Sequence, residues 1–236
     1  MARKLAPGMS GGIPIRGWLA KCSPQFRDEF LALARPKAVA AGNVIYRADE
    51  VGQDICGIRS GVVLVQTRFP HPDAVLLHMM RAGEWFGALA RLNEQGRRVY
   101  TTVARTDVEL LRVPFDELND LLQRRPEGYA KLGLNAIHGL DLATQCAGDL
   151  LIKDAAARCA AGLLRMASRR WASDPEAHLP SEIPATQAEL AMQCNVSRKT
   201  FSRVVGEFSG AGLVSIGYKW LTVEDPARLR ALAEGG

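Results

Sequence analysis

The sequence predicts an α+β protein in which a β-rich N-terminal region, one long helix and a helical C-terminal region follow one another along the chain. Three observations support this prediction. Short apolar stretches separated by turn residues fill residues 37–113, an apolar repeat with spacings of 4 and 3 follows Pro126, and capped helices with two closing strands occupy the last third of the chain. Strands at intervals of about 8–12 residues are typical of a β-roll, a barrel or a sandwich.

The first 20 residues are expected to form a flexible tail, because their glycines and prolines interrupt any apolar run of the kind that a signal peptide needs. Residues 21–125 are expected to form the β-rich domain, with a helix over residues 24–34 ahead of the strands. Short strands are expected over residues 37–113, for example within NVIYRA, DICGIRS, GVVLVQTRF, AVLLHMMRA and VELLRVP.

Residues 84–99 carry the sequence EWFGALARLNEQGRRV. Gly87 supplies a turn, apolar residues follow it, and Arg97 and Arg98 come near the end of the segment. Backbone N–H groups and cations in such a loop can hold an anion against an adjacent sheet. The loop is therefore a candidate anion site.

After Pro126 the pattern changes to that of a helix, which we assign to residues 126–153. Its small and apolar residues form a heptad seam about three heptads long. Such a seam either joins two copies of the chain or packs the helix on its own sheet. We favour the dimer, because the helix is long and connects two regions of different composition. The seam residues are Tyr129, Gly133, Ala136, Leu140, Ala143, Ala147 and Leu150, of which Leu140, Ala143, Ala147 and Leu150 are the expected interface.

Residues 186–208, TQAELAMQCNVSRKTFSRVVGEF, carry the most specific pattern, within a domain expected over residues 154–236. Thr186 and Glu189 have the spacing of a capping box at the start of a helix. Asn195 tolerates the left-handed conformation that a tight turn requires, and Ser197 can cap a second helix. Two helices joined by such a short turn predict a helix-turn-helix.

The second of these helices has an apolar face and a basic face, and the following GLVSIGYKWLTV predicts two strands around a turn. Together they predict a winged helix-turn-helix, whose second helix enters the major groove of DNA. The alternative is an ordinary helical hairpin with a solvated basic face. We favour the winged motif because caps, turn, basic face and wing occur together. The expected apolar residues are Phe201, Val204, Val205 and Phe208, and the expected DNA contacts are Thr186, Gln187, Ser197, Arg198, Lys199, Ser202 and Arg203.

The overall charge does not by itself predict nucleic-acid binding. The chain has a net charge of +5, but residues 154–236 contain ten Lys/Arg and nine Asp/Glu, a net of +1. The prediction of DNA binding therefore rests on the motif, since so small a net charge attracts DNA only weakly.

The five cysteines are scattered, odd in number and never in a CxxC spacing, which argues against a disulfide framework or a Cys-rich metal site. No metal or cofactor is expected, and a reducing cytoplasm is the simplest setting. Cys194, at the predicted turn, is either a redox switch or, as we favour, a small buried hydrophobe. No apolar run reaches the roughly 18 residues of a membrane span. No P-loop, HExxH, Rossmann fingerprint or catalytic-triad signature is present, so an enzyme is not expected.

These features resemble the superfamily of the cyclic-AMP receptor protein and the fumarate–nitrate reduction regulator. The resemblance covers residues 20–225 and rests on GEWFG at 83–87, the basic pair at Arg98, the long helix and SRKTFSR at 197–203. It implies a cyclic-nucleotide-binding-like β-roll, a dimerisation helix and a winged helix-turn-helix. It further implies a second copy of the chain and double-stranded DNA with a palindromic operator as partners, with RNA polymerase and a small anionic effector as further candidates. By position, Arg198 and Arg203 match base-contacting residues, whereas Lys199 stands where the family often has Glu.

The same resemblance argues against a working cyclic-AMP site. Members that bind cyclic nucleotides carry a Glu after the FG pair that holds the ribose, but this chain has Ala88 after Gly87. Arg98, preceded by Arg97, matches the arginine that pairs with the cyclic phosphate, while Val99 replaces a hydroxyl residue. At the position that reaches the purine the chain has Ala143, with Thr144 adjacent. Arg98 then either binds another anion or is structural.

We therefore expect a dimeric, sequence-specific DNA-binding transcription regulator controlled by a signal other than cyclic AMP at the roll. Two alternatives remain open at this stage. One is a DNA-binding regulator without an effector, whose roll is only a dimer platform. The other is an enzyme that uses the roll for catalysis.

Overall fold

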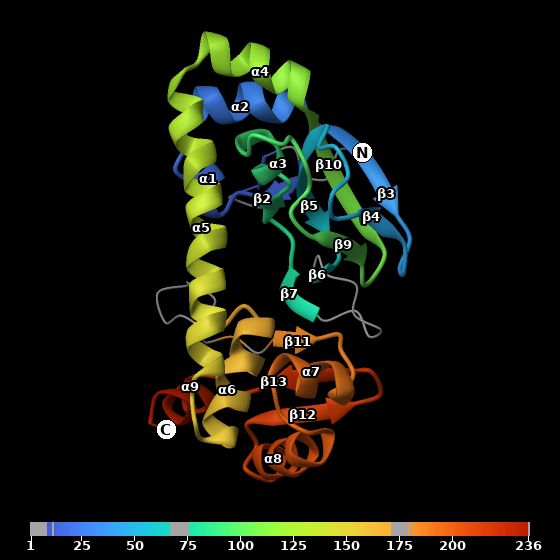
Figure 1. Cartoon of the computed structure of the whole chain (residues 1–236), viewed down its shortest axis with the longest axis vertical. Coiled ribbons are helices and arrows are strands. Elements are labelled where there is room, and N and C mark those ends of the chain that lie inside the picture. Colours follow the sequence, from blue (N-terminus) through green and yellow to red (C-terminus); the bar gives the residue numbers. More distant parts are fainter. Residues whose placement is uncertain (1–8, 11, 67–75, 171–178, 180, 236) are drawn as a thin grey trace. The chain divides into compact units, whose positions relative to one another are not determined.

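The computed structural model describes residues 9–10, 12–66, 76–170, 179 and 181–235, and Figure 1 shows the order of their elements. The chain divides into two compact units, Met1–Pro70 with Met80–Asp141 and His71–Met79 with Leu142–Gly236, and each is described by itself. None of the described helices is both long and apolar enough to cross a membrane.

A β-roll of two sheets precedes the long helix. One sheet has the strand order β3-β10-β5-β8 and the other the order β4-β9-β6-β7, with β10 antiparallel to both of its neighbours. The elements up to Arg124 are β1 (Met9–Ser10), β2 (Ile13–Pro14), α1 (Gly17–Ala20), α2 (Pro24–Ala32), β3 (Arg35–Val39), β4 (Val44–Tyr46), β5 (Asp54–Ser60), β6 (Val63–Gln66), β7 (Leu76–Met80), β8 (Trp85–Phe86), α3 (Leu89–Leu92), β9 (Thr101–Ala104), β10 (Val108–Pro114) and α4 (Phe115–Arg124).

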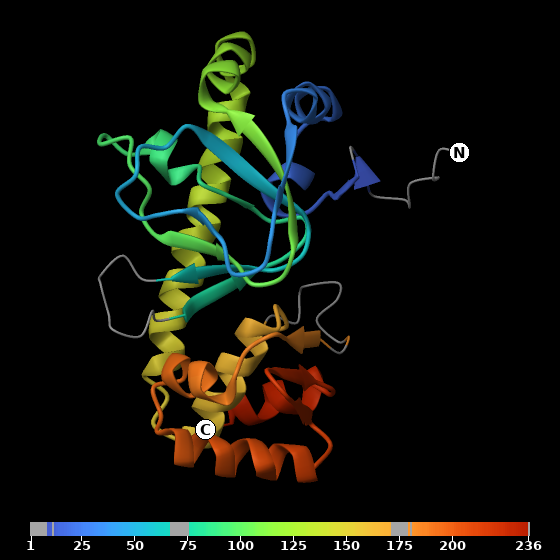
Figure 2. The ribbon, with the colours of Figure 1, turned by 90° about the vertical axis from the view of Figure 1, so that its right-hand side faces the viewer.

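The sheet that contains β5 has a hydrophobic core on each side. Successive residues of a strand point to opposite faces, so Ile55 joins one cluster of buried residues while Cys56 and Ile58 join the other. The first cluster packs the sheet against α1, α2 and α4 and contains the edge-to-face pair of Trp18 and Phe30, whose ring centroids are 5.2 Å apart. The second cluster is the interior of the roll. Figures 1 and 2 both show α2 and α4 side by side.

The expectation of a flexible tail over residues 1–20 does not hold for the part of it that the structure describes. Residues 9–20 contain β1, β2 and α1, and the side chains of Ile13, Trp18 and Leu19 are buried. These apolar residues are separated by glycines and a proline, so no continuous apolar run marks them in the sequence. They are ordered by packing on the core beneath the sheet rather than by a local pattern.

Several elements confirm the predicted pattern, and others were missed. DICGIRS coincides with β5, VELLRVP with β10, and the helix expected over residues 24–34 is α2. The stretches singled out as strands do not include β3 or β9, although β9 lies within the predicted strand region, and the short helix α3 within the 84–99 loop was not predicted. The pattern also missed α4, which lies before Pro126 and begins with Asp116 and Glu117 in its first turn.

Helix α5 (Glu127–Leu150) is one continuous helix of 24 residues. Near its start Leu132 is buried in the core beneath the sheet. Gly128 allows a close approach, since a Cβ there would overlap the ring of Phe26, 2.8 Å from its Cζ atom. Leu140, in the middle of the predicted seam, does not pack on the sheet of the first unit, since it is 67% exposed. The large apolar side chains exposed on α5 are Tyr129, Ile137, Leu140 and Leu150.

The second unit is built around α6 (Ala155–Met166), whose residues are almost all buried and which packs against α7, α8 and α9. The wing sheet has the antiparallel order β11-β13-β12. Within this unit, Figures 1 and 2 show α8 at the edge, with one long side uncovered by other elements. The remaining elements are β11 (Ser181–Ile183), α7 (Gln187–Gln193), α8 (Arg198–Gly210), β12 (Val214–Gly217), β13 (Trp220–Val223) and α9 (Pro226–Glu234).

The close approach at Gly128 yields a testable prediction. In a solvated helix, Gly→Ala stabilises by about 1 kcal/mol, and Gly139→Ala should show this gain because a Cβ at Gly139 meets nothing within 4 Å. Gly128→Ala should instead destabilise by about 1–3 kcal/mol, because the new methyl group must displace a buried ring. Urea unfolding followed by tryptophan fluorescence measures both. A gain in stability for Gly128→Ala equal to that of Gly139→Ala would contradict the packing of α5 on α2.

Candidate functional site

Helix α8 presents the predicted polar face to solvent. Phe201, Val204 and Val205 on its inner side are fully buried. The residues predicted to contact DNA from this helix are exposed, and they are Arg198, Lys199, Ser202 and Arg203. The division of the helix into two faces is therefore confirmed, and the basic face is the exposed one.

The caps and the turn that position α8 are also confirmed. The Thr186 hydroxyl accepts a hydrogen bond from the backbone N–H of Glu189 at 3.2 Å, and the Glu189 carboxylate accepts one from the Thr186 N–H at 2.7 Å. Asn195 adopts a left-handed conformation with φ of 51°, and the Ser197 hydroxyl accepts from the N–H of Thr200 at 3.1 Å. Thr186 and Gln187, both predicted DNA contacts, are half-buried at the start of α7.

Arg203 forms an ion pair that was not predicted from the sequence. Its Nη1 donates to Glu207 Oε1 at 2.7 Å, and both side chains are more than half exposed. An exposed i,i+4 pair of this kind adds only about 0.3–0.5 kcal/mol to stability. Its effect is to orient the guanidinium group while leaving other N–H donors open. The spacing in the sequence could have indicated this pair, because Glu207 follows Arg203 by four residues, about one helical turn.

The tip of the wing adds candidate contacts that the sequence did not single out. Tyr218 is 85% exposed, and Lys219 has a left-handed conformation with φ of 61°. The Lys219 ammonium lies 5.3 Å from the centre of the Tyr218 ring. A Cβ on Gly217 would overlap the indole of Trp220, so this side chain lies directly over the backbone of the turn. An exposed amine and phenol on an ordered turn are suited to contacts with phosphate groups.

Cys194 is buried, as favoured from the sequence. Only 1% of it is exposed, and its hydrogen bond with the Cys159 thiol, together with burial, holds the pKa of Cys194 well above the usual thiol value. The reactive form of a cysteine is the thiolate, which these conditions disfavour. The structure therefore supports a packing role, reinforced by the Arg158 guanidinium, which donates to the Cys194 carbonyl at 3.0 Å.

A buried polar cluster connects the last turns of α5 to the helix-turn-helix within the second unit. Arg165 of α6 is 3% exposed, and it lies 3.7 Å from Asp149 of α5 and donates to Cys146 Sγ at 3.0 Å. The amide of Gln193, oriented with its oxygen toward Arg165, accepts a hydrogen bond at 2.9 Å. Arg170 also pairs with Asp149, at 3.3 Å. One guanidinium group thus ties the end of α5 to the last residue of α7.

In the first unit, the arginine predicted to meet an anion is already paired. Arg98 is 5% exposed and forms an ion pair with Asp54 at 2.7 Å. It also donates to the carbonyls of Asp54 and Gly87, at 2.9 and 3.2 Å, and its Cζ lies 4.3 Å from the centre of the Tyr46 ring. Arg112 binds the other oxygen of Asp54. These contacts favour the structural alternative for Arg98.

The other residues of the predicted effector pocket are not gathered around Arg98. Ala88 is buried at the start of α3, and Arg97 donates to the backbone carbonyl of Asp49 at 2.6 Å. Val99 is 42% exposed. Ala143 and Thr144 are exposed on α5, in the part of the helix that belongs to the second unit. Of the predicted set, the structure of the first unit brings only Gly87 and Arg98 into direct contact.

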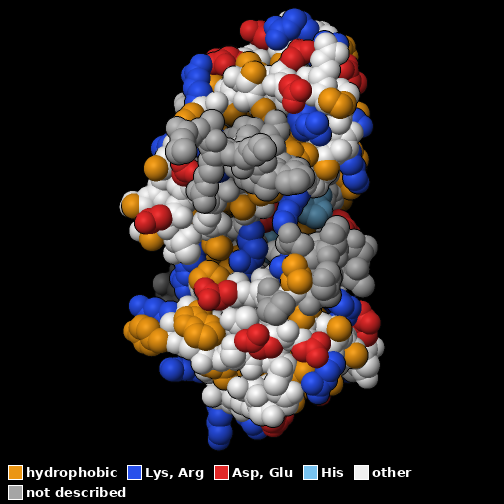
Figure 3. All heavy atoms as spheres, turned by 180° about the vertical axis from the view of Figure 1, so that it is seen from behind, with side chains coloured by type: hydrophobic (Ala, Val, Ile, Leu, Met, Phe, Trp, Pro, Cys, Tyr) orange, Lys and Arg blue, Asp and Glu red, His pale blue; other side chains and the backbone are white. Residues whose placement is uncertain are grey.

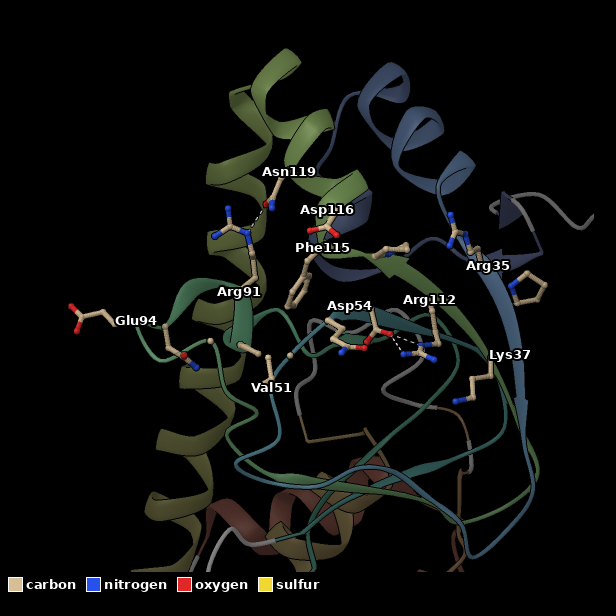
Figure 4. Close-up of a pocket in the computed structure, with 17 residues that line it drawn as sticks. Arg35, Lys37, Val51, Asp54, Arg91, Glu94, Arg112, Phe115, Asp116 and Asn119 are labelled. Carbon is tan, nitrogen blue, oxygen red and sulfur yellow. Dashed lines mark hydrogen bonds and ion pairs between the residues drawn. The ribbon is translucent and has the colours of Figure 1, made fainter.

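A cavity of about 850 Å³ lies in the first unit, beside the Asp54 carboxylate. Figure 4 shows the side chains that line it. They come from β3, from the segment before β5, from α3 and the loop after it, and from the junction of β10 and α4. Ligand sites commonly have volumes of about 300–1,000 Å³, so the cavity has room for a small metabolite. Arg112 contributes to this cavity and to the ion pair with Asp54 at the same time.

No single basic field covers the face shown in Figure 3. Lys and Arg side chains are interspersed there with Asp and Glu, for instance where α2 and α4 form the end of the first unit. A DNA interface is thus indicated by α8 and the wing rather than by bulk charge. Within the described residues, no group of three or more His, Cys, Asp or Glu is placed to hold a metal ion.

Comparisons with known proteins agree with both halves of this description. A model of the cyclic nucleotide-binding domain matches residues 36–125, and a model of the Crp-like helix-turn-helix domain matches residues 157–232. The CRP-like cAMP-activated global transcriptional regulator of Mycobacterium tuberculosis is 26% identical over 220 residues, which cover 86% of this chain and 97% of the relative.

A curated sequence and a solved structure, both from Thermus thermophilus, extend the comparison. The transcriptional regulator SdrP is 30% identical over 182 residues, which cover 75% of this chain and 82% of the relative. The crystal structure of a transcriptional regulator of the CRP/FNR family matches with a TM-score of 0.64 and 26% identity, over 85% of this chain and 98% of that one.

The importance of the buried ion pair between Asp54 and Arg98 can be tested by the free energy of unfolding of variants. Asp54→Asn keeps the shape of the side chain but leaves the enclosed Arg98 without a counter-charge, and it should destabilise the protein by about 3–5 kcal/mol. Glu117→Gln breaks the exposed pair between Glu117 and Arg35 and should change stability by about 0–1 kcal/mol. Denaturant unfolding of the two variants provides the comparison. Equal effects would show that Asp54 is not the central counter-charge of the roll.

Proposed function

The chain belongs to the CRP/FNR family of transcriptional regulators, and from that premise we propose that it acts as a homodimer whose binding to a two-fold symmetric operator is controlled by a ligand of the β-roll. Its helix-turn-helix is a DNA-binding module, and the chain is a regulator rather than an enzyme. The single observation that carries the dimer is the exposed apolar stripe of α5, in which Leu140 is 67% exposed.

We propose that α8 enters the major groove and that its N-terminal residues contact base edges. Arg198 and Arg203 can each donate two parallel hydrogen bonds to guanine O6 and N7, and Lys199 can donate to the same atoms. A Glu at this position would instead accept from cytosine N4, so Lys199 is expected to change the preferred half-site relative to family members with Glu. Tyr218 and Lys219 of the wing are proposed to contact the DNA backbone.

The polar cluster around Arg165 supports a route by which α5 can affect the recognition helix. Asp149 on α5 and Gln193 at the end of α7 both bind Arg165, and α7 is joined to α8 by the turn at Asn195. A buried ion pair is destabilised strongly when one partner moves away, so such a cluster favours discrete arrangements over gradual bending. We propose that a change in α5 reaches α8 through this contact.

We propose that cyclic AMP is not the controlling ligand, although the relative from Mycobacterium tuberculosis is named as cAMP-activated. Ala88 lacks the carboxylate that would hold the ribose, and Arg98 is already paired with Asp54. A missing hydrogen bond to a buried polar group costs about 1–3 kcal/mol, or roughly tenfold to hundredfold in affinity.

A substitution of Arg203 can distinguish a contact with a base from a contact with a phosphate group. Arg203→Ala should weaken binding to the preferred operator by about 1–3 kcal/mol and relax the preference at one base pair. Binding to random DNA should change much less. Fluorescence anisotropy with both DNAs at one fixed salt concentration measures the difference. Equal losses on the two DNAs would assign Arg203 to a phosphate.

The dimer prediction concerns the seam of α5. Leu140→Glu places a charge in the seam and should convert the dimer into monomers, because an unpaired charge is strongly disfavoured in an apolar interface. His138→Glu, which introduces the same charge at an exposed position outside the seam, should leave the dimer intact. Sedimentation velocity gives the assembly state of each variant. A dimeric Leu140→Glu protein would refute the proposed interface.

A further inference from the structure

The cavity beside Asp54 shares Lys37, Asp54 and Arg112 with a smaller adjoining pocket. This smaller pocket reaches the interior of the roll at Tyr46 and Cys56. Lys37 of β3 is paired with Leu110 of β10, and Arg35 is paired with Arg112, two residues further along the same strand. Paired residues of antiparallel strands, and residues two apart, share one face of a sheet. This face carries the roll's apolar interior at Leu110. Lys37 and Arg112 therefore lie on the same face of the sheet as the apolar interior and make one end of it positively charged.

At this end the cations Lys37, Arg98 and Arg112 outnumber the carboxylates. The carboxylates that line the smaller adjoining pocket with them are Asp54 and Glu50. Asp54 carries one negative charge and is shared by two arginines, Arg98 and Arg112. Within the part of the chain that the structure describes, the side chain of Lys37 has no hydrogen bond or ion pair. Arg91 donates to the neutral amide of Asn119 at 2.6 Å.

The other charged groups that line the cavity do not remove this excess. Arg35 is paired with Glu117 of α4, and the two carboxylates of the lining besides Asp54 are Asp116 and Glu94. Figure 4 shows Glu94 directed away from the other labelled side chains and Asp116 on the side of Phe115, whereas Lys37 and Arg112 point toward the same part of the cavity. That part is attractive to an anion.

The opposite wall of the cavity is apolar. The ring of Phe115, at the start of α4, points into the cavity in Figure 4, and Ala90 of α3 lies beside it in the lining. Val51 at the rim is 63% exposed, a large exposure for a branched apolar side chain. A ligand that matches both walls has an anionic group at one end and an apolar body about the size of one ring.

We propose that this cavity binds a small organic anion, with a carboxylate or phosphate held by Lys37 and Arg112 and an apolar body against Phe115 and Val51. The anion competes with the Asp54 carboxylate for Arg112. Asp54 remains bound to Arg98, which contacts Gly87 in the 84–99 loop, so occupancy of the cavity alters the ion pair that anchors this loop. That the anion is the controlling ligand rests on the proposed function, whereas the binding site rests on the first unit alone.

The test is isothermal calorimetry on the full chain without DNA, so that a failure of DNA binding cannot obscure the result. The probes are phenyl phosphate and benzoate, with benzyl alcohol as the neutral analogue, inorganic phosphate as the analogue without a ring, and cyclic AMP. Phenyl phosphate or benzoate is expected to bind in the micromolar to millimolar range, tighter than benzyl alcohol and inorganic phosphate. The tighter of the two probes identifies the anionic group.

The variants locate the site. Lys37→Gln removes one charge-assisted hydrogen bond. It should lower the affinity for the tighter-binding probe by roughly tenfold to hundredfold. Lys21→Gln, an exposed lysine of the same unit outside the cavity, should leave the affinity unchanged. Circular dichroism confirms that both variants are folded.

Three results would overturn the proposal. One is the absence of heat from both aromatic anions at millimolar concentration. The second is an affinity that Lys37→Gln does not change. The third is an equal affinity for the aromatic anions and their neutral or ring-free analogues. Binding of cyclic AMP that is lost in Arg98→Ala but kept in Lys37→Gln would instead place the anion site at the 84–99 loop.

Discussion

A single buried carboxylate organises the roll of this protein. Asp54 stands at the first position of β5 and its side chain is 5% exposed, yet it binds two guanidinium groups, one from the 84–99 loop and one from β10. A charge in such surroundings is tolerated only when it is paired and hydrogen-bonded. The position of the loop, the end of β10 and the cavity next to them are therefore mutually dependent. The same pairing explains why an arginine at the family's phosphate-binding position need not indicate a nucleotide site.

The second unit also contains a buried ion pair, between Arg165 and Asp149 at the end of α5. Asp149 and Arg165 are both nearly inaccessible, and the cluster around them includes side chains from α5, α6 and α7. Apolar packing could hold these helices together equally well, but it would tolerate small sliding movements. A directional network fixes the spacing of the helices and makes any change in it a switch between distinct contacts. If α8 enters the major groove as proposed, such a network would hold it at a defined angle.

The sequence predicted the second unit better than the first, for a physical reason. Caps, the left-handed Asn195 and the two faces of α8 are local features, set by residues within one or two helical turns of each other. The pairing of Arg98 with Asp54 joins residues 44 positions apart, and nothing in the local pattern of either indicates it. The buried segment around Trp18 and Leu19 is likewise ordered by distant parts of the chain. The cavity depends on strand register, which a single sequence leaves open.

The wing hairpin has a consequence for the entropy of complex formation. Trp220 covers the backbone at Gly217, and Lys219 already has the left-handed conformation that closes the turn. Fixing the backbone of one residue costs about 1–2 kcal/mol, and here that ordering takes place during folding. Any contact that Tyr218 and Lys219 make with a phosphate group therefore begins from a preformed tip. Most of the free energy of such a contact would appear as affinity rather than being lost in ordering a mobile loop.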